Sequence, residues 1–306
     1  MVRSRVSFEQ GDLPRGKSSH APNFFVVGAA KSGTSTLADA LNQHPDVFVA
    51  PVKEPFFFVE DFGDSDWQGY LSLFRNAGAH RAIGEASTGY LYCAASPGMI
   101  HTAFPAARII IILRHPAEMA FSLWQFMRQV GSETLSFREA IAAESSRAKD
   151  MAFRQACANW WANYLYVERA RYYPQVKRFI DRFGTDAVYI TTFERFIATP
   201  GPVMSEIYGH IGADQNFKPQ LRHVNCGGSV RFTFLQRIRN GRYPYLKRWL
   251  PQEMRWRLRR LVSRVNLDDQ RKAYLDTRQR AELCEMLRED TLALAQFVDI
   301  TPWGLP

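Results

Sequence analysis

The segment Arg108–Leu113 (RIIIIL) constrains the fold more than any other part of the sequence. Its apolar run is continuous, as is typical of a strand in the middle of a parallel sheet that is covered on both faces. Further apolar runs at 23–27, 47–49 and 187–191 predict additional short strands. Helical patterns lie between and after the strands, at 36–41, 117–129, 160–183 (with a break or restart at Pro174) and 276–297. This alternation predicts an α/β fold with a central parallel sheet flanked by helices.

The composition is that of an ordinary soluble globular protein. Of the 306 residues, 46% are hydrophobic and 23% are charged, which excludes collagen, coiled-coil and intrinsically disordered classes. We expect a flexible polar arm over residues 1–20 and a single domain over residues 21–306. There is neither a run of about 18 apolar residues that could span a membrane nor the apolar core of a secretory signal. The sequence therefore predicts a cytoplasmic protein.

The positive charge of the chain is concentrated in one segment. The whole protein carries a formal net charge of +9. Residues 231–272 contain 13 basic and three acidic residues, and this difference of +10 exceeds the charge of the whole chain. The excess indicates an anionic partner, and at this point nucleic acid, a membrane surface and a phosphorylated cofactor all remain open.

A turn rich in small residues connects the first strand to the first helix. Residues 28–35 read Gly-Ala-Ala-Lys-Ser-Gly-Thr-Ser. Backbone N–H groups at such a helix start bind phosphate, and the helix dipole favours its negative charge. Lys31 adds a point charge, while Thr34 and Ser35 add hydroxyl donors. The alternative is a tight structural turn, since Lys31 precedes Gly33 and the spacing is not that of a Walker A loop.

A second candidate anion site follows the strand at 108–113. Arg114 stands directly after this strand, and Ser122 lies eight residues further on, about two turns into the next helix. Both side chains can therefore face one site. Ligands of open parallel sheets bind outside the carboxyl ends of the strands, which is where Arg114 is expected.

These two motifs resemble those of sulfotransferases. Residues 25–37, followed by Asn42–Pro45, look like the loop that binds the 5′-phosphosulfate group, and Leu113–Ser122 is similar to the 3′-phosphate motif. Residues 84–91, 161–211 and 240–244 resemble further segments of the branch that includes heparan sulfate sulfotransferases and many bacterial enzymes. The resemblance implies a P-loop-like three-layer sandwich and the cofactor 3′-phosphoadenosine 5′-phosphosulfate (PAPS). Its implied cofactor-binding residues are Lys31, Ser32, Gly33, Thr34, Ser35, Arg114, Ser122 and Arg242.

The resemblance also implies the catalytic residues. Lys31 would stabilise the leaving 5′-phosphate, and Glu54, in the loop 53–58, would remove the proton of an acceptor hydroxyl or amine. By analogy with phosphoryl transfer, an in-line reaction depends mostly on positioning and charge stabilisation. A sulfuryl group carries less charge than a phosphoryl group, so we expect no metal ion. His44 and His115 are alternative bases, although both precede proline at the ends of elements, where packing or capping is the competing explanation.

The acceptor is less well defined than the cofactor. Related polysaccharide enzymes often have Glu-Lys-Ser or Glu-Lys-Thr where this chain has Glu-Ala-Ser at 85–87, so a contact of that lysine is absent. The residues 124–127 (Trp-Gln-Phe-Met) favour a more apolar acceptor site. Trp160, Trp161 and Tyr164 are candidates for stacking on adenine or acceptor, with core packing as the alternative. We expect a saccharide or a natural product, and an anionic acceptor would suit the basic segment.

Two other functions are alternatives to sulfuryl transfer. A P-loop kinase needs a Gly-Lys-Ser/Thr sequence and an acidic metal ligand after a strand, whereas Leu113 is followed by Arg114. A basic, non-catalytic protein that binds nucleic acid or anionic lipid is suggested by the segment 231–272. Under the sulfotransferase hypothesis no nucleic-acid partner is expected. Peripheral membrane contact and the oligomeric state remain open.

Overall fold

The computed structural model describes residues 20–62, 66–221, 229–230, 267–268 and 274–304. The chain divides into two compact units. The first comprises Met1–His115, Arg171–Val224 and Glu289–Pro306, and the second comprises Pro116–Ala170 and Asn225–Arg288. The arm predicted at 1–20 lies outside the described residues except for its last position, and so does most of the basic segment 231–272. The single domain over 21–306 stays a prediction.

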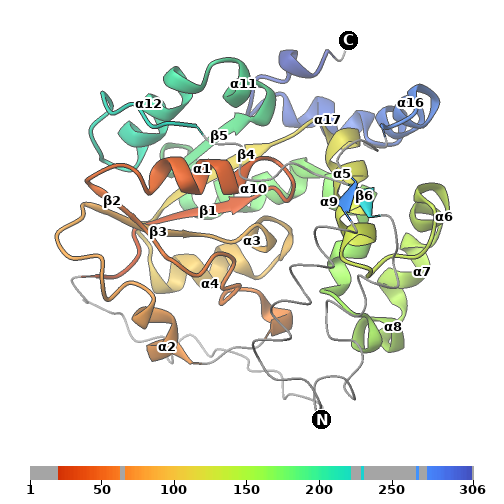
Figure 1. Cartoon of the computed structure of the whole chain (residues 1–306), viewed down its shortest axis with the longest axis horizontal. Coiled ribbons are helices and arrows are strands. Elements are labelled where there is room, and N and C mark those ends of the chain that lie inside the picture. Colours follow the sequence, from red (N-terminus) through yellow and green to blue (C-terminus); the bar gives the residue numbers. More distant parts are fainter. Residues whose placement is uncertain (1–19, 63–65, 222–228, 231–266, 269–273, 305–306) are drawn as a thin grey trace. The chain divides into compact units, whose positions relative to one another are not determined.

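The first unit contains a five-stranded parallel sheet in the order β2-β3-β1-β4-β5 (Figure 1). Its strands are β1 (Phe24–Gly28), β2 (Val47–Val49), β3 (Ala82–Ala86), β4 (Arg108–Leu113) and β5 (Val188–Thr192). Every residue of β1 is buried, and so is every residue of β4 except Arg108. The predicted α/β fold with a central parallel sheet is therefore confirmed, and β4 lies inside the sheet as its apolar run indicates.

Helices of the first unit cover both faces of this sheet. They are α1 (Thr34–Leu41), α2 (Trp67–Ser72), α3 (Gly89–Tyr92), α4 (Ser96–Ala103), α10 (Tyr172–Phe183), α11 (Phe193–Ala198), α12 (Pro200–His210) and, mostly, α17 (Arg288–Leu294). Short 3₁₀ turns are η1 (Glu60–Phe62), η3 (Thr185–Ala187) and η4 (Thr301–Trp303). Among the helices that the structure describes, none has the length and apolar character needed to cross a membrane.

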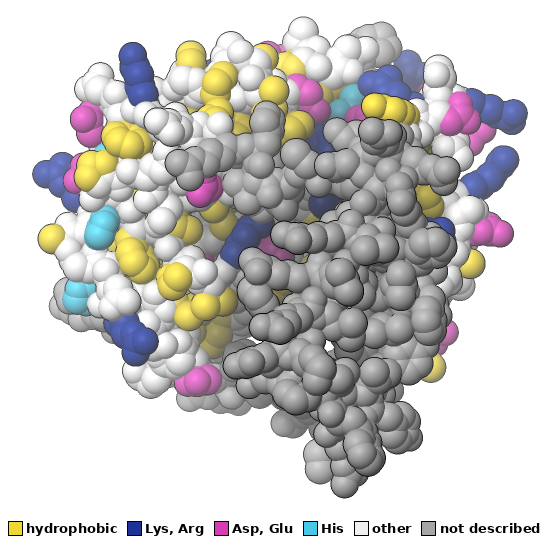
Figure 2. Space-filling model, viewed as in Figure 1, with side chains coloured by type: hydrophobic (Ala, Val, Ile, Leu, Met, Phe, Trp, Pro, Cys, Tyr) yellow, Lys and Arg dark blue, Asp and Glu magenta, His cyan; other side chains and the backbone are white. Residues whose placement is uncertain are grey.

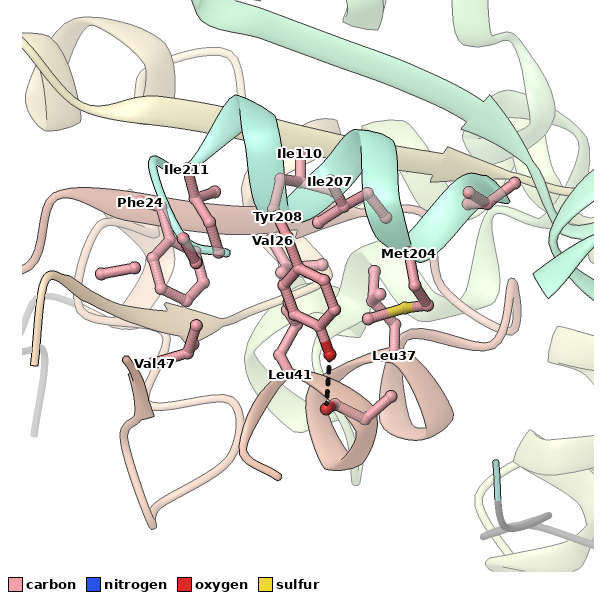
Figure 3. Packing of buried hydrophobic residues seen from close by; sticks show 14 of the residues in the cluster. Phe24, Val26, Leu37, Leu41, Val47, Ile110, Met204, Ile207, Tyr208 and Ile211 are labelled. Carbon is pink, nitrogen blue, oxygen red and sulfur yellow. Dashed lines mark hydrogen bonds between the residues drawn. The ribbon is translucent and has the colours of Figure 1, made fainter. Parts of the chain in front are cut away.

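A hydrophobic cluster joins α1 and α12 to one face of the sheet (Figure 3). Alternate residues of the strands, such as Phe24 and Val26, point toward this cluster because successive side chains of a strand face opposite sides. Tyr208 of α12 is fully buried, and its hydroxyl donates a hydrogen bond to the carbonyl of Ala40, 3.2 Å away. The apolar packing of this cluster fixes α1, and with it the turn that precedes α1, against the sheet.

Aromatic rings pack against the opposite face of the sheet. The ring of Phe25 contacts the rings of Phe58 and Phe104 at centroid distances of 6.0 and 5.7 Å. Phe104 is the C-terminal cap of α4, and Phe58 belongs to the loop that follows β2. The predicted layering, with helices on both sides of the sheet, is thus present. It also places Phe58, in the loop that carries Glu54, against the sheet face opposite α1.

Two predicted helices have different boundaries in the structure. The pattern at 160–183 forms η2 (Trp161–Tyr164), α9 (Tyr166–Ala170) and α10. The helix α10 starts at Tyr172, two residues before Pro174, and continues through it. Pro174 lies in the first turn of α10, where its missing N–H would have had no helical partner in any case. The pattern at 276–297 forms two helices, α16 (Thr277–Met286) and α17, which are separated at Leu287. Asp276 is the N-terminal cap of α16.

The second unit is mostly helical within its described residues. It contains α5 (Pro116–Gln129), α6 (Phe137–Ala142), α7 (Glu144–Lys149), α8 (Met151–Ala156), η2, α9 and α16, together with the two-residue strands β6 (Ser229–Val230) and β7 (Leu267–Asp268). The helix predicted at 117–129 is confirmed as α5. Its buried residues repeat at helical spacing, as an amphipathic helix requires.

A buried ion pair holds the helices of this unit together. The two terminal nitrogens of the Arg147 guanidinium donate to the Glu133 carboxylate, at 2.7 and 3.1 Å, and the hydroxyl of Tyr166 donates to the same carboxylate. The side chains of Glu133 and Arg147 are only 2% and 11% exposed. Burial alone would raise the pKa of Glu133, but these hydrogen bonds and the charge of Arg147 outweigh burial and lower it.

Removing one partner of this pair should therefore destabilise the protein. We expect Glu133→Ala to lower the free energy of unfolding by about 3 kcal/mol, because Arg147 is left buried and unpaired. Since the pKa of Glu133 is lowered on folding, its contribution is present near neutral pH and is lost as the pH falls through the folded-state pKa. Denaturant unfolding at pH 7 measures the loss, and Glu285→Ala, at an exposed position of α16, is the control.

Candidate functional site

Three neighbouring strands end side by side at one edge of the sheet. The strand β1 ends at Gly28, β3 at Ala86 and β4 at Leu113. The strands β1 and β4 are followed directly by the two predicted anion-binding segments, the turn 29–33 and Arg114. The strand β3 is followed by residues 87–88, which belong to the segment 84–91 that resembles the family. Because the strands are parallel, these segments come together at the carboxyl edge, where such sheets bind ligands.

Gly33 shapes the turn between β1 and α1. It is the N-terminal cap residue of α1 and has a left-handed backbone with φ 83°. A Cβ at this position would lie 2.8 Å from the ring of Phe193, the first residue of α11. The first turn of α1 contains no acidic residue, and the first backbone N–H groups of a helix lack helical partners. This helix start therefore suits an anion.

We expect Gly33→Ala to damage both stability and anion binding. The strained backbone and the contact with Phe193 should lower the free energy of unfolding by about 1–3 kcal/mol. Gly304→Ala is a matched control, since Gly304 is also left-handed (φ 60°) but has open space around an added Cβ. Thermal unfolding compares the two variants. A Gly33→Ala protein as stable as Gly304→Ala would contradict the close packing of this turn.

Lys31 belongs to the same turn, and the positive charges of Arg114 and Lys53 lie near it. Its pKa is lowered, first by burial and then by the nearby charges of Arg114 and Lys53, while the charge of Glu54 acts in the opposite direction. A bound anion would relieve this repulsion between like charges. The set of donors and charges therefore fits a phosphate or phosphosulfate group, and the charge of Glu54 is close enough to act on Lys31.

Lys53 connects the turn to the loop that carries Glu54. Its ammonium group donates a hydrogen bond to the hydroxyl of Ser35 on α1, and it lies 3.9 Å from the Glu54 carboxylate. The contact with Ser35 links the loop that carries Glu54 to the start of α1.

Glu54 is fixed at both its backbone and its side chain. Its N–H donates to the carbonyl of Ala86 at 3.0 Å, and its carboxylate accepts a 2.9 Å hydrogen bond from the hydroxyl of Thr88. The side chain keeps 34% of its surface exposed, so a carboxylate oxygen can reach an incoming molecule. Thr88 was not recognised as a site residue from the sequence. Its position two residues beyond the carboxyl end of β3 is the signal that could have found it.

Arg114 lies where the sequence predicts it, directly after β4. One of its guanidinium nitrogens donates to the carbonyl of Lys31 at 3.4 Å, and the guanidinium lies 5.4 Å from the centre of the Phe193 ring. Its predicted partner Ser122 is a residue of α5 in the second unit. Arg242 lies outside the described residues. A phosphate contact shared by Arg114, Ser122 and Arg242 stays a prediction.

The remaining predicted residues of the turn differ in exposure. Ser32 is fully buried and its hydroxyl donates to the carbonyl of Ala30. Thr34 is 4% exposed, and Ser35 is partly exposed. The hydroxyl of Ser32 is thus engaged inside the protein, and the cofactor contacts of Ser32, Thr34 and Ser35 stay a prediction.

The two histidines considered as alternative bases have structural surroundings. His44 is buried between the rings of Tyr208 and Phe217, and it accepts a hydrogen bond from the N–H of Asp46 through Nδ1. Its Nε2 lies 2.9 Å from the carbonyl of Asp214, so that this nitrogen is the donor. His115 is buried against the ring of Trp303. Both histidines are thus packed among aromatic rings, and their role as alternative bases stays a prediction.

The aromatic residues at 160–164 contact basic side chains of the second unit. The guanidinium of Arg154 lies 3.8 Å from the centre of the Trp161 ring, and that of Arg169 lies 5.1 Å from Trp160. Tyr164 is buried and contacts the guanidinium of Arg147. These contacts favour packing over the stacking on adenine or acceptor that the sequence left open.

The surface chemistry of the described residues adds two observations. On the face shown in Figure 2, Lys and Arg side chains are interspersed with Asp and Glu side chains. Within the described part of the chain, no group of three or more His, Cys, Asp and Glu side chains could hold a metal ion.

Comparison with known proteins decides the family. The sulfotransferase domain family matches residues 21–226, which is more than half of the chain. The chain belongs to the sulfotransferase family. This match covers the turn, the Glu54 loop and the segment from Arg114 to Ser122, so the predicted family is confirmed.

Three sulfotransferases to which this chain is similar support the family assignment. The crystal structure of a sulfotransferase from Alicyclobacillus acidocaldarius has a TM-score of 0.70 and 28% identity, and it covers 93% of this chain and 99% of that chain. Human heparan sulfate glucosamine 3-O-sulfotransferase 6 is 25% identical over 228 residues, which is 73% of this chain and 61% of that protein. The membrane-associated sulfotransferase kil1 of Dictyostelium discoideum is 29% identical over 116 residues, or 37% of this chain. The chain spans about a quarter of the length of kil1, since the match covers 25% of it.

Proposed function

We propose that this protein transfers a sulfuryl group from PAPS to a hydroxyl or amine of an acceptor, with Glu54 as the general base. The observation that supports the proposal is that the Lys31 turn and the Glu54 loop lie at the same edge of the sheet. The charge of Glu54 acts on the ammonium of Lys31, and Lys53 lies between the turn and the Glu54 carboxylate. A cationic phosphate site next to a partly exposed carboxylate suits transfer to an acceptor that must lose a proton.

The residues of the site divide into two groups by chemistry. When bound, PAPS would supply the sulfuryl group and a nucleotide bisphosphate as leaving group. Lys31 and the N–H groups at the start of α1 would hold the 5′-phosphate and stabilise the charge that develops on it. Arg114, Ser122 and Arg242 would hold the 3′-phosphate. Glu54, fixed by Thr88, would accept the proton of the acceptor.

The acceptor class is proposed from the relatives and from the charge of the chain. A saccharide amine or hydroxyl is supported by the human relative, whose name specifies heparan sulfate glucosamine. A natural-product hydroxyl is the alternative, but the residues 124–127 do not decide it, because Met127 is fully buried and the ring of Trp124 packs against Phe121 and Phe137. The basic segment 231–272 favours an anionic acceptor or peripheral contact with an anionic membrane surface. A cytoplasmic location stays a prediction from the sequence.

The test is transfer of radiolabelled sulfate from PAPS to a panel of acceptors. The panel includes sulfated and unsulfated oligosaccharides, lipid-linked glycans, hydroxylated natural products and amines. We expect PAPS-dependent labelling of one class, and we expect it to persist in the presence of EDTA because a sulfuryl group needs less charge neutralisation than a phosphoryl group. Strict dependence on Mg²⁺ with ATP as donor would favour a kinase. Salt-sensitive DNA binding that the nucleotide bisphosphate does not affect would favour the non-catalytic alternative.

A further inference from the structure

A buried carboxylate lies behind the Glu54 loop and takes no part in the chemistry proposed above. Glu85, the last residue but one of β3, is completely buried. Its two oxygens accept three hydrogen bonds, from the hydroxyls of Tyr70 and Tyr90 at 2.8 Å each and from that of Ser87 at 2.7 Å. Burial raises the pKa of Glu85 to about 7, while the three hydrogen bonds act to lower it. Burying a carboxyl group is costly, so this arrangement calls for an explanation.

Each of the three hydroxyl donors also contacts the loop that carries Glu54. Ser87 accepts a hydrogen bond from the N–H of Phe56 at 3.3 Å, and Tyr90 accepts a longer one, 3.5 Å, from the N–H of Phe58. The ring of Tyr70 stacks on the ring of Phe57 at 4.5 Å. Three consecutive loop residues, 56–58, are thus held by the three side chains that converge on one carboxylate.

The direction of these hydrogen bonds determines which atoms of the hydroxyls can bind the loop. Because Glu85 accepts the protons of Ser87 and Tyr90, the lone pairs of these hydroxyls are left for the N–H groups of the loop. Chains of hydrogen bonds of this kind strengthen one another in a buried environment. The loop backbone is unusual on both sides of Pro55, with φ 56° at Glu54 and 54° at Phe56. A non-glycine residue holds such angles only when its surroundings determine them.

We propose that Glu85 is a positioning residue, which through Ser87, Tyr90 and Tyr70 fixes the loop 54–58 and so aims the Glu54 carboxylate at the acceptor. Ser87 also adjoins Thr88, which holds the Glu54 carboxylate directly. The inference rests on the proposed function, because it assigns Glu85 a role only through Glu54. Glu85 itself is too deeply buried to touch cofactor or acceptor.

Three variants test the proposal. Glu85→Gln keeps the shape but reverses one hydrogen bond, and Tyr90→Phe removes one hydroxyl and keeps the charge. Tyr208→Phe is the matched control, since it removes an equally buried tyrosine hydroxyl on the opposite face of the sheet. We expect Glu85→Gln and Tyr90→Phe to lower kcat by about 10- to 100-fold through misplacement of Glu54. The KM for PAPS and the affinity for the nucleotide bisphosphate should stay unchanged.

A second readout does not depend on the acceptor. Hydrogen exchange of the amides of Phe56 and Phe58 should be faster in Tyr90→Phe than in the wild type, and unchanged in Tyr208→Phe. If Glu85→Gln does not fold, Tyr90→Phe alone carries the test. Equal kcat and equal loop exchange in Tyr90→Phe and Tyr208→Phe would overturn the positioning role.

A double-variant cycle separates this inference from the proposed function. In a Glu54→Gln background, Tyr90→Phe should cause no further loss of kcat, because the group that the loop positions is already absent. Full additivity of the two losses would overturn the positioning of Glu54 by Glu85. If Glu54→Gln is inactive while Tyr90→Phe is fully active, the base assignment stands and only the positioning role fails. Wild-type activity of Glu54→Gln would instead overturn the base assignment and the inference with it.

Discussion

Lys31→Ala is expected to lower the rate of sulfuryl transfer by about 100- to 1,000-fold, because one preorganised charge at the leaving phosphate is lost. Lys31 is positioned for this role by the turn between β1 and α1. Burial, and after it the positive charges of Arg114 and Lys53, lower its pKa, and the group of positive charges as a whole stabilises a bound anion. The measurement is single-turnover transfer from radiolabelled PAPS at saturating concentration of the acceptor identified in the panel.

A surface lysine provides the control for this prediction. Lys177 on α10 is exposed and paired with Asp181, so Lys177→Ala removes the same charge far from the predicted chemistry. We expect it to retain wild-type transfer. Full activity of Lys31→Ala would mean that the turn does not hold the leaving phosphate through this side chain, whatever the family membership of the chain.

Glu54→Gln is expected to lower kcat by about 100- to 10,000-fold, the range that a general base contributes. The amide keeps the shape of the side chain and can still accept the hydrogen bond from Thr88, so the loop should stay in place. Binding of the nucleotide bisphosphate should be retained, because the predicted phosphate contacts come from the turn and from Arg114. Isothermal titration measures this binding and separates it from the loss of turnover.

The control for Glu54 lies a few residues along the same segment. Glu60 is exposed in η1, and Glu60→Gln should leave both binding and transfer unchanged. If Glu54→Gln lost binding and turnover together, its carboxylate would be part of the structure of the nucleotide site and not the base.

The elements that the sequence predicted best are those whose signal is local. The apolar runs of β1 and β4 are buried on both faces, so hydrophobicity alone identifies them. In contrast, β3 reads Ala-Ile-Gly-Glu-Ala and has almost no strand propensity. It is a strand because it lies between β1 and β2, and Gly84 is needed there since a Cβ would meet the carbonyl of Phe24 at 2.4 Å.

The candidate site was predictable where a motif is continuous in sequence. The turn with Lys31, and Arg114 after β4, were found because strand, turn and helix follow one another directly. The support of Glu54 was not found, since Thr88 is 34 residues away and Glu85 acts through Tyr70, Ser87 and Tyr90. Such contacts depend on which loops the sheet order brings together, and a single sequence contains no local signal for them.

The most direct test of the account is one single-turnover experiment with radiolabelled PAPS, comparing the wild type with Glu54→Gln in the presence of EDTA. We predict that the wild type transfers its label to the acceptor without added metal, and that Glu54→Gln keeps its label on the bound donor. Transfer by Glu54→Gln at the wild-type rate would contradict the assignment of the base. The absence of transfer from PAPS by the wild type to any acceptor of the panel, with turnover restored only by ATP and Mg²⁺, would contradict the proposed function as a whole.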